Sequence, residues 1–174
     1  MPNVRKITLR KLNPKKDISN KYLNWMNDLE VHKYTEQKYV KHSLINIRKF
    51  VIEKNKSKNE FLYGIFLKKN NSKIHIGNIK LGPINFIHMT GEISYFIGEK
   101  DLWGKGYTTL AIKEISRIAK KMGLKKLKAG FYEKNIGSKK VLEKNNFKLE
   151  GEMKSEILYK NKRYSAYCFG KVLK

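Results

Sequence analysis

The chain has 174 residues, a length that suits one domain with a hydrophobic core of its own. It carries 39 Lys and Arg against 15 Asp and Glu, a formal net charge of +24, and its single cysteine, Cys168, excludes an internal disulfide. No stretch approaches the roughly 18–20 apolar residues of a membrane-spanning helix, and the N-terminus lacks the apolar segment of a signal peptide, so we expect a soluble cytoplasmic protein.

The basic charge does not by itself indicate a nucleic-acid partner. Lysine outnumbers arginine 34 to 5, and the chain also has 16 Asn and 18 Ile, a skew typical of an AT-rich genome. Nucleic-acid readers usually rely on arginine and exposed aromatic residues, whereas these lysines are spread along the whole chain. We therefore expect no nucleic acid or membrane as a partner, and we expect the charge to attract anionic small molecules such as coenzymes or nucleotide sugars.

The first third of the chain predicts one strand followed by two helices. The segment from Val4 to Leu12 alternates between apolar and polar residues, as a half-buried strand does. The segments Ser19 to Met26 and Ser43 to Lys54 each begin with a typical N-cap residue and continue with apolar residues at helical spacing. Between them, Leu29 to Val40 has no clean period and is expected to be a loop that holds about one helical turn.

After the second helix the pattern changes to alternation, which predicts strands. Three strands are expected there: Phe61 to Leu67, Ile74 to Leu81, and Gly91 to Gly98. A turn rich in Lys and Asn, Lys68 to Lys73, joins the first two, and Gly82 to Thr90 connects the second to the third. In the third strand, alternation places Tyr95 on the same side as Ile97 and opposite Glu92.

A glycine turn joins this third strand to an amphipathic helix. The helix runs from about Thr108 to Met122, and the turn before it reads Asp101-Leu102-Trp103-Gly104-Lys105-Gly106-Tyr107-Thr108. Gly104 and Gly106 can take backbone angles closed to other residues and bring no Cβ near a ligand. Because backbone donors at a helix start lack carbonyl partners, such a turn suits the pyrophosphate of a cofactor; a plain tight turn is the alternative.

A second strand–helix junction follows. A strand from Leu124 to Tyr132 leads into a helix from Asn135 to Asn145. The two helix starts can then lie side by side at the carboxyl ends of adjacent parallel strands, where α/β sheets bind ligands. Three strands finish the chain: Phe147 to Gly151, Lys154 to Tyr159, and Arg163 to Leu173. No linker or repeat interrupts the pattern, so we expect a single domain over residues 1–174, an α/β sandwich on a mixed sheet.

Two motifs in these junctions resemble those of one known family. They read Trp-Gly-Lys-Gly-Tyr-Thr-Thr-Leu-Ala from Trp103, and Asn-x-x-Ser-x-x-Val-Leu-Glu-Lys-x-x-Phe-x-x-Glu-Gly from Asn135. Both are similar to the motifs of the GNAT superfamily of acetyl-CoA-dependent N-acetyltransferases, and most similar to the branch that acetylates ribosomal-protein N-termini. The resemblance covers nearly the whole chain in the expected order. It implies a GNAT fold: a mixed, mostly antiparallel sheet splayed between two parallel strands and flanked by helices.

The resemblance also implies where acetyl-CoA, the co-substrate, would bind. The coenzyme would lie between the two parallel strands, with its pyrophosphate on the amides of the glycine turn. At the first position of the family's signature, usually Gln or Arg, this chain has Asp101, which puts a side-chain contact there in doubt. Lys139 or Lys140 could meet the phosphates, and no metal is expected. The residues assigned to the coenzyme are Phe96, Ile97, Leu102, Trp103, Gly104, Lys105, Gly106, Tyr107, Thr108, Asn135, Ser138 and Lys140.

Acetyl transfer needs a neutral amine, so a base must take a proton from the ammonium that prevails at neutral pH. The resemblance implies that Glu92, at the start of the central strand, is this base; a solvent-facing strand residue is the alternative interpretation. Glu99 and Glu36 are weaker candidates. A main-chain amide near Phe96 and Ile97 would steady the oxyanion.

The leaving thiolate also needs a proton. Many members of the superfamily supply it from a Tyr seven residues after the Asn of the second motif, which is Asn135 here. This chain has Leu142 at that position, so it cannot use that tyrosine. Ser138 or a water molecule becomes the candidate acid, and a structural hydroxyl near the helix N-cap is the alternative for Ser138.

In this family the acceptor site borders the stretch from Trp25 to Phe50. The residues expected to contact the acceptor are Trp25, His32, Tyr34 and Glu36, and core packing is the alternative for Trp25 and Tyr34. The four histidines, which also include His42, His75 and His88, show no metal-binding spacing and are expected to be structural or exposed.

The acceptor itself is predicted from similarity rather than from chemistry. The stretch from Trp25 to Phe50 is similar to family members that acetylate an amino sugar, which would be carried by a nucleotide in surface-glycan synthesis. A basic protein also suits an acceptor that carries a diphosphate. The alternatives are an N-terminal protein acetyltransferase, an acetyltransferase of antibiotics or polyamines, and, from another class, a non-catalytic module that binds acetyl-CoA or nucleic acid; a polyamine is disfavoured because a protein with a net charge of +24 repels a cation. A monomer and a homodimer are both compatible with the sequence.

Overall fold

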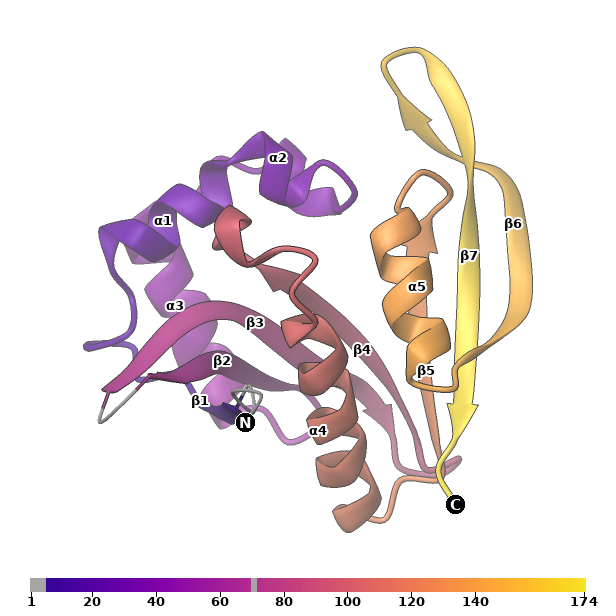
Figure 1. The fold of residues 1–174 in the computed structure, drawn as a ribbon, viewed down its shortest axis with the longest axis horizontal. Coiled ribbons are helices and arrows are strands. Elements are labelled where there is room, and N and C mark those ends of the chain that lie inside the picture. Colours follow the sequence, from indigo (N-terminus) through magenta and orange to yellow (C-terminus); the bar gives the residue numbers. More distant parts are fainter. Residues whose placement is uncertain (1–5, 70–71) are drawn as a thin grey trace.

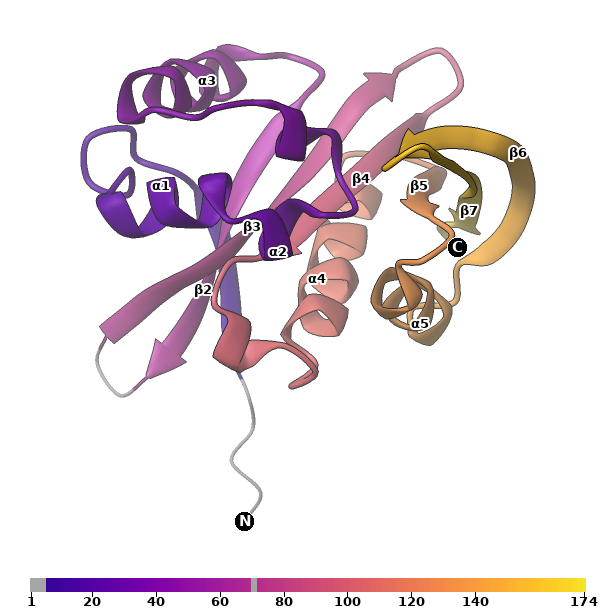
Figure 2. The same cartoon turned by 90° about the horizontal axis from the view of Figure 1, so that it is seen from above.

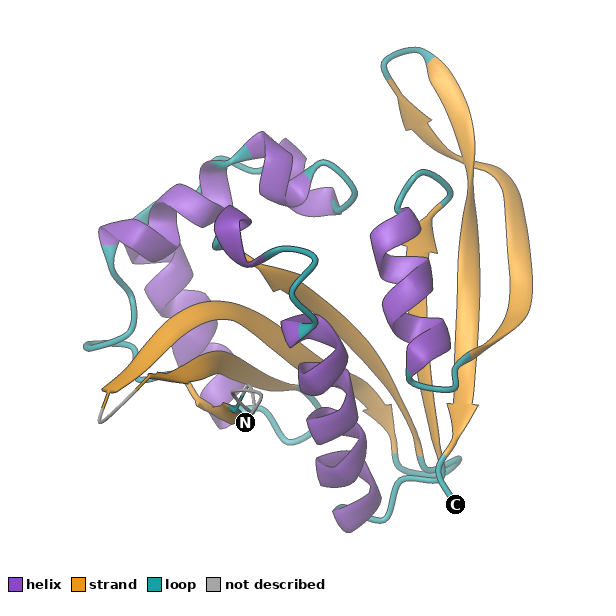
Figure 3. Cartoon of the chain, in the orientation of Figure 1, coloured by secondary structure: helices purple, strands orange, loops and turns teal. Residues whose placement is uncertain are grey.

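In the described part of the chain, residues 6–69 and 72–174 of a computed structural model, seven strands form one sheet in the order β1-β2-β3-β4-β5-β7-β6 (Figure 1, Figure 3). The strands are β1 (Ile7–Lys11), β2 (Phe61–Lys69), β3 (Ser72–Asn85), β4 (Thr90–Ile97), β5 (Lys126–Tyr132), β6 (Lys148–Tyr159) and β7 (Lys162–Val172). The helices are α1 (Asn20–Asn27), α2 (Leu29–His32), α3 (Leu44–Lys56), α4 (Tyr107–Lys121) and α5 (Ile136–Lys144), with two 3-10 turns, η1 (Glu36–Tyr39) and η2 (Lys100–Leu102).

Strands β4 and β5 are the one parallel pair among the described strands, and they pair only at their beginnings. Residues Thr90 to Glu92 lie in register with Lys126 to Lys128, and both strands then continue without pairing to each other. All other neighbours in the sheet are antiparallel. Figure 1 shows the two strands diverging from this point. The predicted mixed sheet, splayed between two parallel strands, is confirmed.

Helices cover both faces of the sheet, and each face has its own core (Figure 2). On one face, α4 and α5 bury Ile112, Ile115 and Leu142 completely. On the other face, α1 and α3 bury Trp25 and Val51. Burial of such side chains contributes roughly 1.5–3 kcal/mol each, which is the main force that holds the layers together. No helix in the described residues is long and apolar enough to cross a membrane.

Local signals in the sequence set the ends of the helices. Ser43 and Asn46 form a capping box in which each side chain accepts a hydrogen bond from the other's backbone amide at the start of α3. Ser19 caps α1 by accepting from the amide of Tyr22. Gly123 follows α4 with a φ of +85°, a conformation that other residues rarely adopt. These predicted boundaries are confirmed to within two residues.

The strand boundaries differ more from the prediction. Strand β3 does not end at Leu81: it runs through Gly82 and Pro83 to Asn85, because an irregularity in the register accommodates the proline, which has no amide to donate. The segments Phe147–Gly151 and Lys154–Tyr159 are one strand, β6, whose two register shifts break the alternation that a straight strand would show.

Two further predictions need comment. The stretch from Leu29 to Val40 holds two short helical turns, α2 and η1, rather than about one, because Asp28 and Thr35 each accept a backbone hydrogen bond that starts a turn. The predicted first strand begins at Val4, which lies outside the described residues, as do residues 70–71 of the predicted hairpin turn.

Candidate active site

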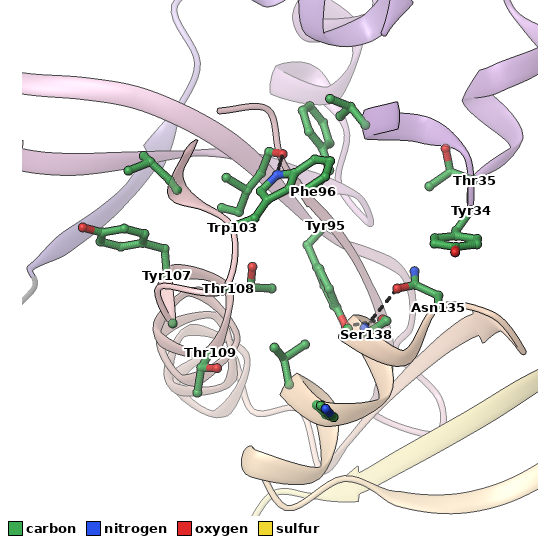
Figure 4. A pocket seen from close by; sticks show the side chains of 18 of the residues that line it. Tyr34, Thr35, Tyr95, Phe96, Trp103, Tyr107, Thr108, Thr109, Asn135 and Ser138 are labelled. Carbon is green, nitrogen blue, oxygen red and sulfur yellow. Dashed lines mark hydrogen bonds between the residues drawn. The ribbon is translucent and has the colours of Figure 1, made fainter. Parts of the chain in front are cut away.

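A cavity of about 540 Å³ opens where β4 and β5 diverge (Figure 4). Its walls come from four places: the end of β4, the turn before α4, the start of α5, and the segment that joins α2 to η1. The start of α5 lies on the side of β5, and the other three lie on the side of β4. The cavity is therefore lined both by the two helix starts and by the segment of residues 30–35.

The glycine turn forms one wall. Gly104 and Gly106 have φ values of +71° and +83°, which explains why both positions are glycine. No side chain caps α4, so its positive N-terminal end is open to an anionic ligand. The indole of Trp103 donates a 2.8 Å hydrogen bond to the carbonyl oxygen of Ile97, which ties the turn to the end of β4. These features fit the pyrophosphate of a coenzyme.

The start of α5 forms the facing wall. The side-chain oxygen of Asn135 accepts a 3.0 Å hydrogen bond from the amide of Ser138 and so caps the helix. The hydroxyl groups of Ser138 and Tyr95 share a 2.7 Å hydrogen bond across the gap between the two strands. Burial raises the pKa of Tyr95, and the bond to Ser138 opposes this only in part, so Tyr95 keeps its proton throughout the neutral range.

Sequence reasoning missed Tyr95. Alternation placed it beside Ile97, on the side that packs against the helices, and nothing in the local pattern separates a core tyrosine from one at a cavity. The one signal in the sequence was that the family's tyrosine is missing from its usual position, where this chain has Leu142. In the structure Leu142 is completely buried in the core. A tyrosine hydroxyl does reach Ser138 in this protein, but it comes from β4 instead of α5.

The predicted coenzyme residues converge on this cavity. Those that line it are Phe96, Ile97, Leu102, Trp103, Gly104, Gly106, Tyr107, Thr108, Asn135, Ser138 and Lys140. Lys105 does not line it, and Asp101 is exposed outside it, so the unusual acid does not face the pyrophosphate position. Other lining residues that the sequence did not single out are Thr109, Val141 and Lys144. The contact of each residue with the coenzyme remains a prediction.

Glu92 lies outside the cavity wall. It is exposed, and it pairs in register with Lys128 where β4 and β5 still lie together. It is close enough to Cys168 to raise the pKa of that thiol, although burial is the larger cause. Because side chains alternate along a strand, Glu92 faces the side of the sheet opposite to Tyr95. Glu92 therefore does not line the cavity, and its role as a base stays a prediction.

The other two carboxylates considered as bases are no closer. Glu99 accepts a 2.9 Å hydrogen bond from the indole of Trp25 and pairs with Lys21 at 3.1 Å. Glu36 is exposed in η1 and does not line the cavity. Neither is placed to act on a ligand directly.

Of the four residues expected to contact the acceptor, Tyr34 lines the cavity and the other three do not. Trp25 and His32 are only 6% and 2% exposed, and Trp25 belongs to the core formed by α1 and α3. The imidazole of His32 lies against Phe96, with 4.9 Å between the ring centroids. The side chains of Trp25 and His32 are buried and do not face the cavity, so their contact with the acceptor stays a prediction. Two neighbours in the sequence, Lys33 and Thr35, line the cavity instead.

The remaining histidines show no sign of a shared site. Nε2 of His75 lies 2.8 Å from the side-chain oxygen of Asn78, and burial lowers the pKa of His75. His88 is exposed. Within residues 6–69 and 72–174, no group of three or more His, Cys, Asp or Glu side chains is arranged to hold a metal ion.

A splayed parallel pair with two helix starts facing one cavity is an arrangement that can hold the pyrophosphate of a coenzyme. The chain belongs to the acetyltransferase (GNAT) domain family, whose model matches residues 6–148. This family binds acetyl-CoA, and the open start of α4 together with Lys140 and Lys144 fits such a donor. The predicted superfamily and donor are thereby confirmed.

Several solved structures share the fold. A spermidine N-acetyltransferase from Vibrio cholerae, solved with CoA and spermine, is 19% identical, with a TM-score of 0.83, over 96% of this chain and 95% of that one. The microcin C7 self-immunity acetyltransferase, solved with acetyl-CoA and AMP, is 20% identical, with a TM-score of 0.78, over 96% of this chain and 92% of that one. The predicted ribosomal-protein branch is not singled out by these structures.

One curated protein is similar over part of its length. An uncharacterised protein of Methanocaldococcus jannaschii is 33% identical over 84 residues, which are 48% of this chain. The matched stretch makes up 17% of that protein, so the relative is much longer than the part it shares with this chain.

Proposed function

We propose that this protein is an N-acetyltransferase that moves the acetyl group of acetyl-CoA directly to a primary amine. The observation that carries the proposal is the hydrogen bond between Tyr95 and Ser138, which joins β4 to the first turn of α5 inside a cavity that both helix starts face. In this proposal the two hydroxyls lie near the reacting end of a coenzyme whose pyrophosphate rests on the start of α4.

The glycine turn and the α5 start bind the donor in this proposal. Amides of the turn before α4 hold the pyrophosphate, Lys140 meets a phosphate, and Asn135 orients the pantetheine arm. Bound acetyl-CoA supplies an activated thioester. The amides near Phe96 and Ile97, at the end of β4, are the candidates for steadying the negative charge that develops on the thioester oxygen.

Tyr95 and Ser138 are proposed to relay a proton. Because burial raises the pKa of Tyr95, its hydroxyl is a poor net acid, but it can accept a proton and release its own at the same moment. The attacking amine forms a C–N bond and becomes cationic, the C–S bond breaks, and the proton passes from nitrogen through the hydroxyls to sulfur. Glu92 would assist only through water, by removing the proton that makes the free amine an ammonium ion.

An amino sugar, carried by a nucleotide in surface-glycan synthesis, is the acceptor that we propose. The net charge of +24 favours an acceptor with phosphate groups and disfavours a polycation. Along the α2–η1 segment the cavity wall carries Lys33 as well as Glu30, and these two form a 3.2 Å ion pair, so the wall does not present a concentrated negative charge. We also propose that residues 1–174 form one cytoplasmic domain, as a monomer or a homodimer.

Release of free CoA thiol from acetyl-CoA tests this function. The amines to be compared are UDP-glucosamine, glucosamine, a peptide with a free N-terminal serine, and spermidine. We expect turnover with the nucleotide-linked sugar and a kcat/KM at least about tenfold lower with the others, the effect of losing one good contact. Turnover of the peptide instead would identify an N-terminal acetyltransferase, and turnover of spermidine would overturn the charge argument.

Two variants separate the relay from binding. Tyr95→Phe and Ser138→Ala should each lower kcat by about 100-fold, the lower range for general acid–base catalysis, and leave the Kd for CoA within about threefold. If no amine is turned over while salt-sensitive DNA binding is observed, the protein is a binding module and the proposal fails.

A further inference from the structure

Lys38 of η1 inserts its ammonium group among three tyrosine rings. Its Nζ atom lies 4.8 Å from the ring centroid of Tyr39, 4.7 Å from that of Tyr132 and 4.6 Å from that of Tyr159. These distances are well inside the limit of about 6 Å for an attraction between a cation and an aromatic face. The three rings come from η1, β5 and β6, so the cluster joins the two halves of the molecule.

The same ammonium group also closes the segment that lines the cavity. Lys38 Nζ donates a 3.4 Å hydrogen bond to the carbonyl oxygen of Lys33. The residues between them include Tyr34 and Thr35, which are part of the cavity wall. Within the segment, the amide of Lys38 donates to the carbonyl of Thr35 at 3.4 Å. The position of Lys38 therefore determines where Tyr34 and Thr35 stand.

On the other side of the gap, the rings are attached to the opposite wall. Tyr132 ends β5, and its carbonyl oxygen accepts a 2.8 Å hydrogen bond from the amide of Asn135, which lines the cavity. The hydroxyl of Tyr39 donates to the carbonyl of Leu158 in β6 at 3.3 Å, a second link between the halves. Tyr34 and Asn135 both line the cavity, and Figure 4 labels both of them.

The cluster lies on the face of β5 turned away from the core below α5. Leu127, Ala129 and Phe131 point into that core, so alternation turns Lys128 and Tyr132 to the other face. This is also the face of Glu92, which pairs with Lys128. Tyr95 and Ser138 reach each other from the opposite side. The cluster itself does not line the cavity, and it joins the segment of Lys33 to Thr35, which does, to β5 and β6.

We propose that Lys38, Tyr39, Tyr132 and Tyr159 form a lysine clasp that positions the acceptor wall. By joining the segment of Lys33 to Lys38 to the start of α5, the clasp fixes the width of the cavity between Tyr34 and Asn135. Lys38 is a positioning residue for the acceptor and not for the coenzyme. The assignment of this wall to the acceptor rests on the proposed function; the clasp itself rests on the contacts.

Hydrogen exchange tests the clasp without any acceptor. The amides to follow are those of Thr35, Lys38, Val40 and Asn135, each of which donates a backbone hydrogen bond within the two joined segments. Lys38→Met keeps the length of the side chain and removes its charge. We expect these amides to exchange about tenfold faster in Lys38→Met than in the wild type, the effect of losing about 1.4 kcal/mol of cation–ring attraction. Lys41→Met, an exposed lysine in the same region, should exchange like the wild type and is the matched control.

Enzyme kinetics then distinguish a loss of acceptor positioning from a general loosening of the structure. With UDP-glucosamine, or whichever amine of the panel is turned over, Lys38→Met should raise the acceptor KM about tenfold and leave the Kd for CoA within about twofold. Lys38→Arg keeps the cation and should restore the acceptor KM to within about threefold of the wild type. A rise in the CoA Kd as large as the rise in acceptor KM, or no rescue by arginine, would overturn the positioning role.

A second variant covers the case in which Lys38→Met does not fold. Tyr159→Leu removes one ring near the end of β6 and should speed exchange at the same four amides. If both variants exchange like the wild type, the clasp does not hold the segment. Because exchange needs no acceptor, absence of turnover with every amine would refute the proposed function and leave this measurement intact. Wild-type turnover with unchanged exchange in both variants would refute only the clasp.

Discussion

Acid should destabilise the fold through His32, and one substitution should remove this effect. The imidazole is 2% exposed, and burial lowers its pKa from 6.5 to about 4, with the neighbouring His42 adding to the shift and Asp28 opposing it. The hydroxyl of Thr35 donates to the carbonyl of His32, so we assign the proton of the ring to Nδ1, which then donates to the Thr35 oxygen at 3.2 Å. The folded state therefore holds a neutral imidazole.

The sign and size follow from this shift. Below pH 6.5 the unfolded chain takes up a proton at His32 that the folded chain refuses, so this stabilisation is full above pH 6.5 and is lost as the pH falls towards 4. The difference between the two pKa values corresponds to about 3 kcal/mol in total, of which about 2 kcal/mol is lost between pH 7.5 and pH 5.

Urea unfolding followed by circular dichroism at pH 7.5, 6 and 5 measures this loss. In His32→Asn the side-chain amide can replace the Nδ1 donor but does not titrate, so the loss between pH 7.5 and 5 should be smaller than in the wild type by about 2 kcal/mol. His88→Asn, at an exposed position, should keep the wild-type pH dependence. An equal pH dependence in His32→Asn and the wild type would refute the reasoning. A raised acceptor KM with an unchanged pH dependence would return His32 to the acceptor site.

Three further substitutions probe the cavity. Gly106→Val should raise the Kd for CoA at least about tenfold in calorimetry, because a branched residue is strained at a φ of +83° and crowds the turn; an unchanged Kd would refute the placement of the pyrophosphate on this turn. Trp103→Phe loses the 2.8 Å hydrogen bond to Ile97 and should raise the KM for acetyl-CoA about fivefold, the equivalent of roughly 1 kcal/mol; an unchanged KM would mean that this tie does not shape the donor site. Glu92→Gln should lower kcat about tenfold, and unaltered kinetics would remove Glu92 from the mechanism.

Local chemistry explains which parts of the fold could be predicted. The helix starts at Ser19, Ser43 and Asn135 were predictable because only a few residue types can cap a helix. The turn at Gly104 and Gly106 was predictable because glycine is the residue that most readily takes a positive φ. The full lengths of the long strands were not predictable. Bulges interrupt the alternation of apolar and polar residues, while the hydrogen-bonded pairing with the neighbouring strand continues. At Gly82 and Pro83 the local signals favour a connection, and pairing with the neighbouring strand overrides them.

The candidate site shows the same division. Residues within the two motifs line the cavity, since each motif carries its own strand, turn and helix start. The acceptor side depends on how the segment from Trp25 to Tyr39 folds over β4, and sequence spacing does not reveal which of its side chains point inward. His32 packs into the core and Thr35, three residues later, faces the cavity. Tyr95 escaped prediction because its partner is 43 residues away.

The short pairing of β4 with β5 has a mechanical consequence. Three residues on each strand form the seam between a half-sheet of β1 to β4 and a half-sheet of β5 to β7. Beyond the seam, contacts such as those of Tyr95 and Lys38 span the gap through side chains. A ligand that binds both walls of the cavity adds contacts between the two half-sheets. We therefore expect it to make the two half-sheets unfold as a single unit and to raise the thermal midpoint of both together.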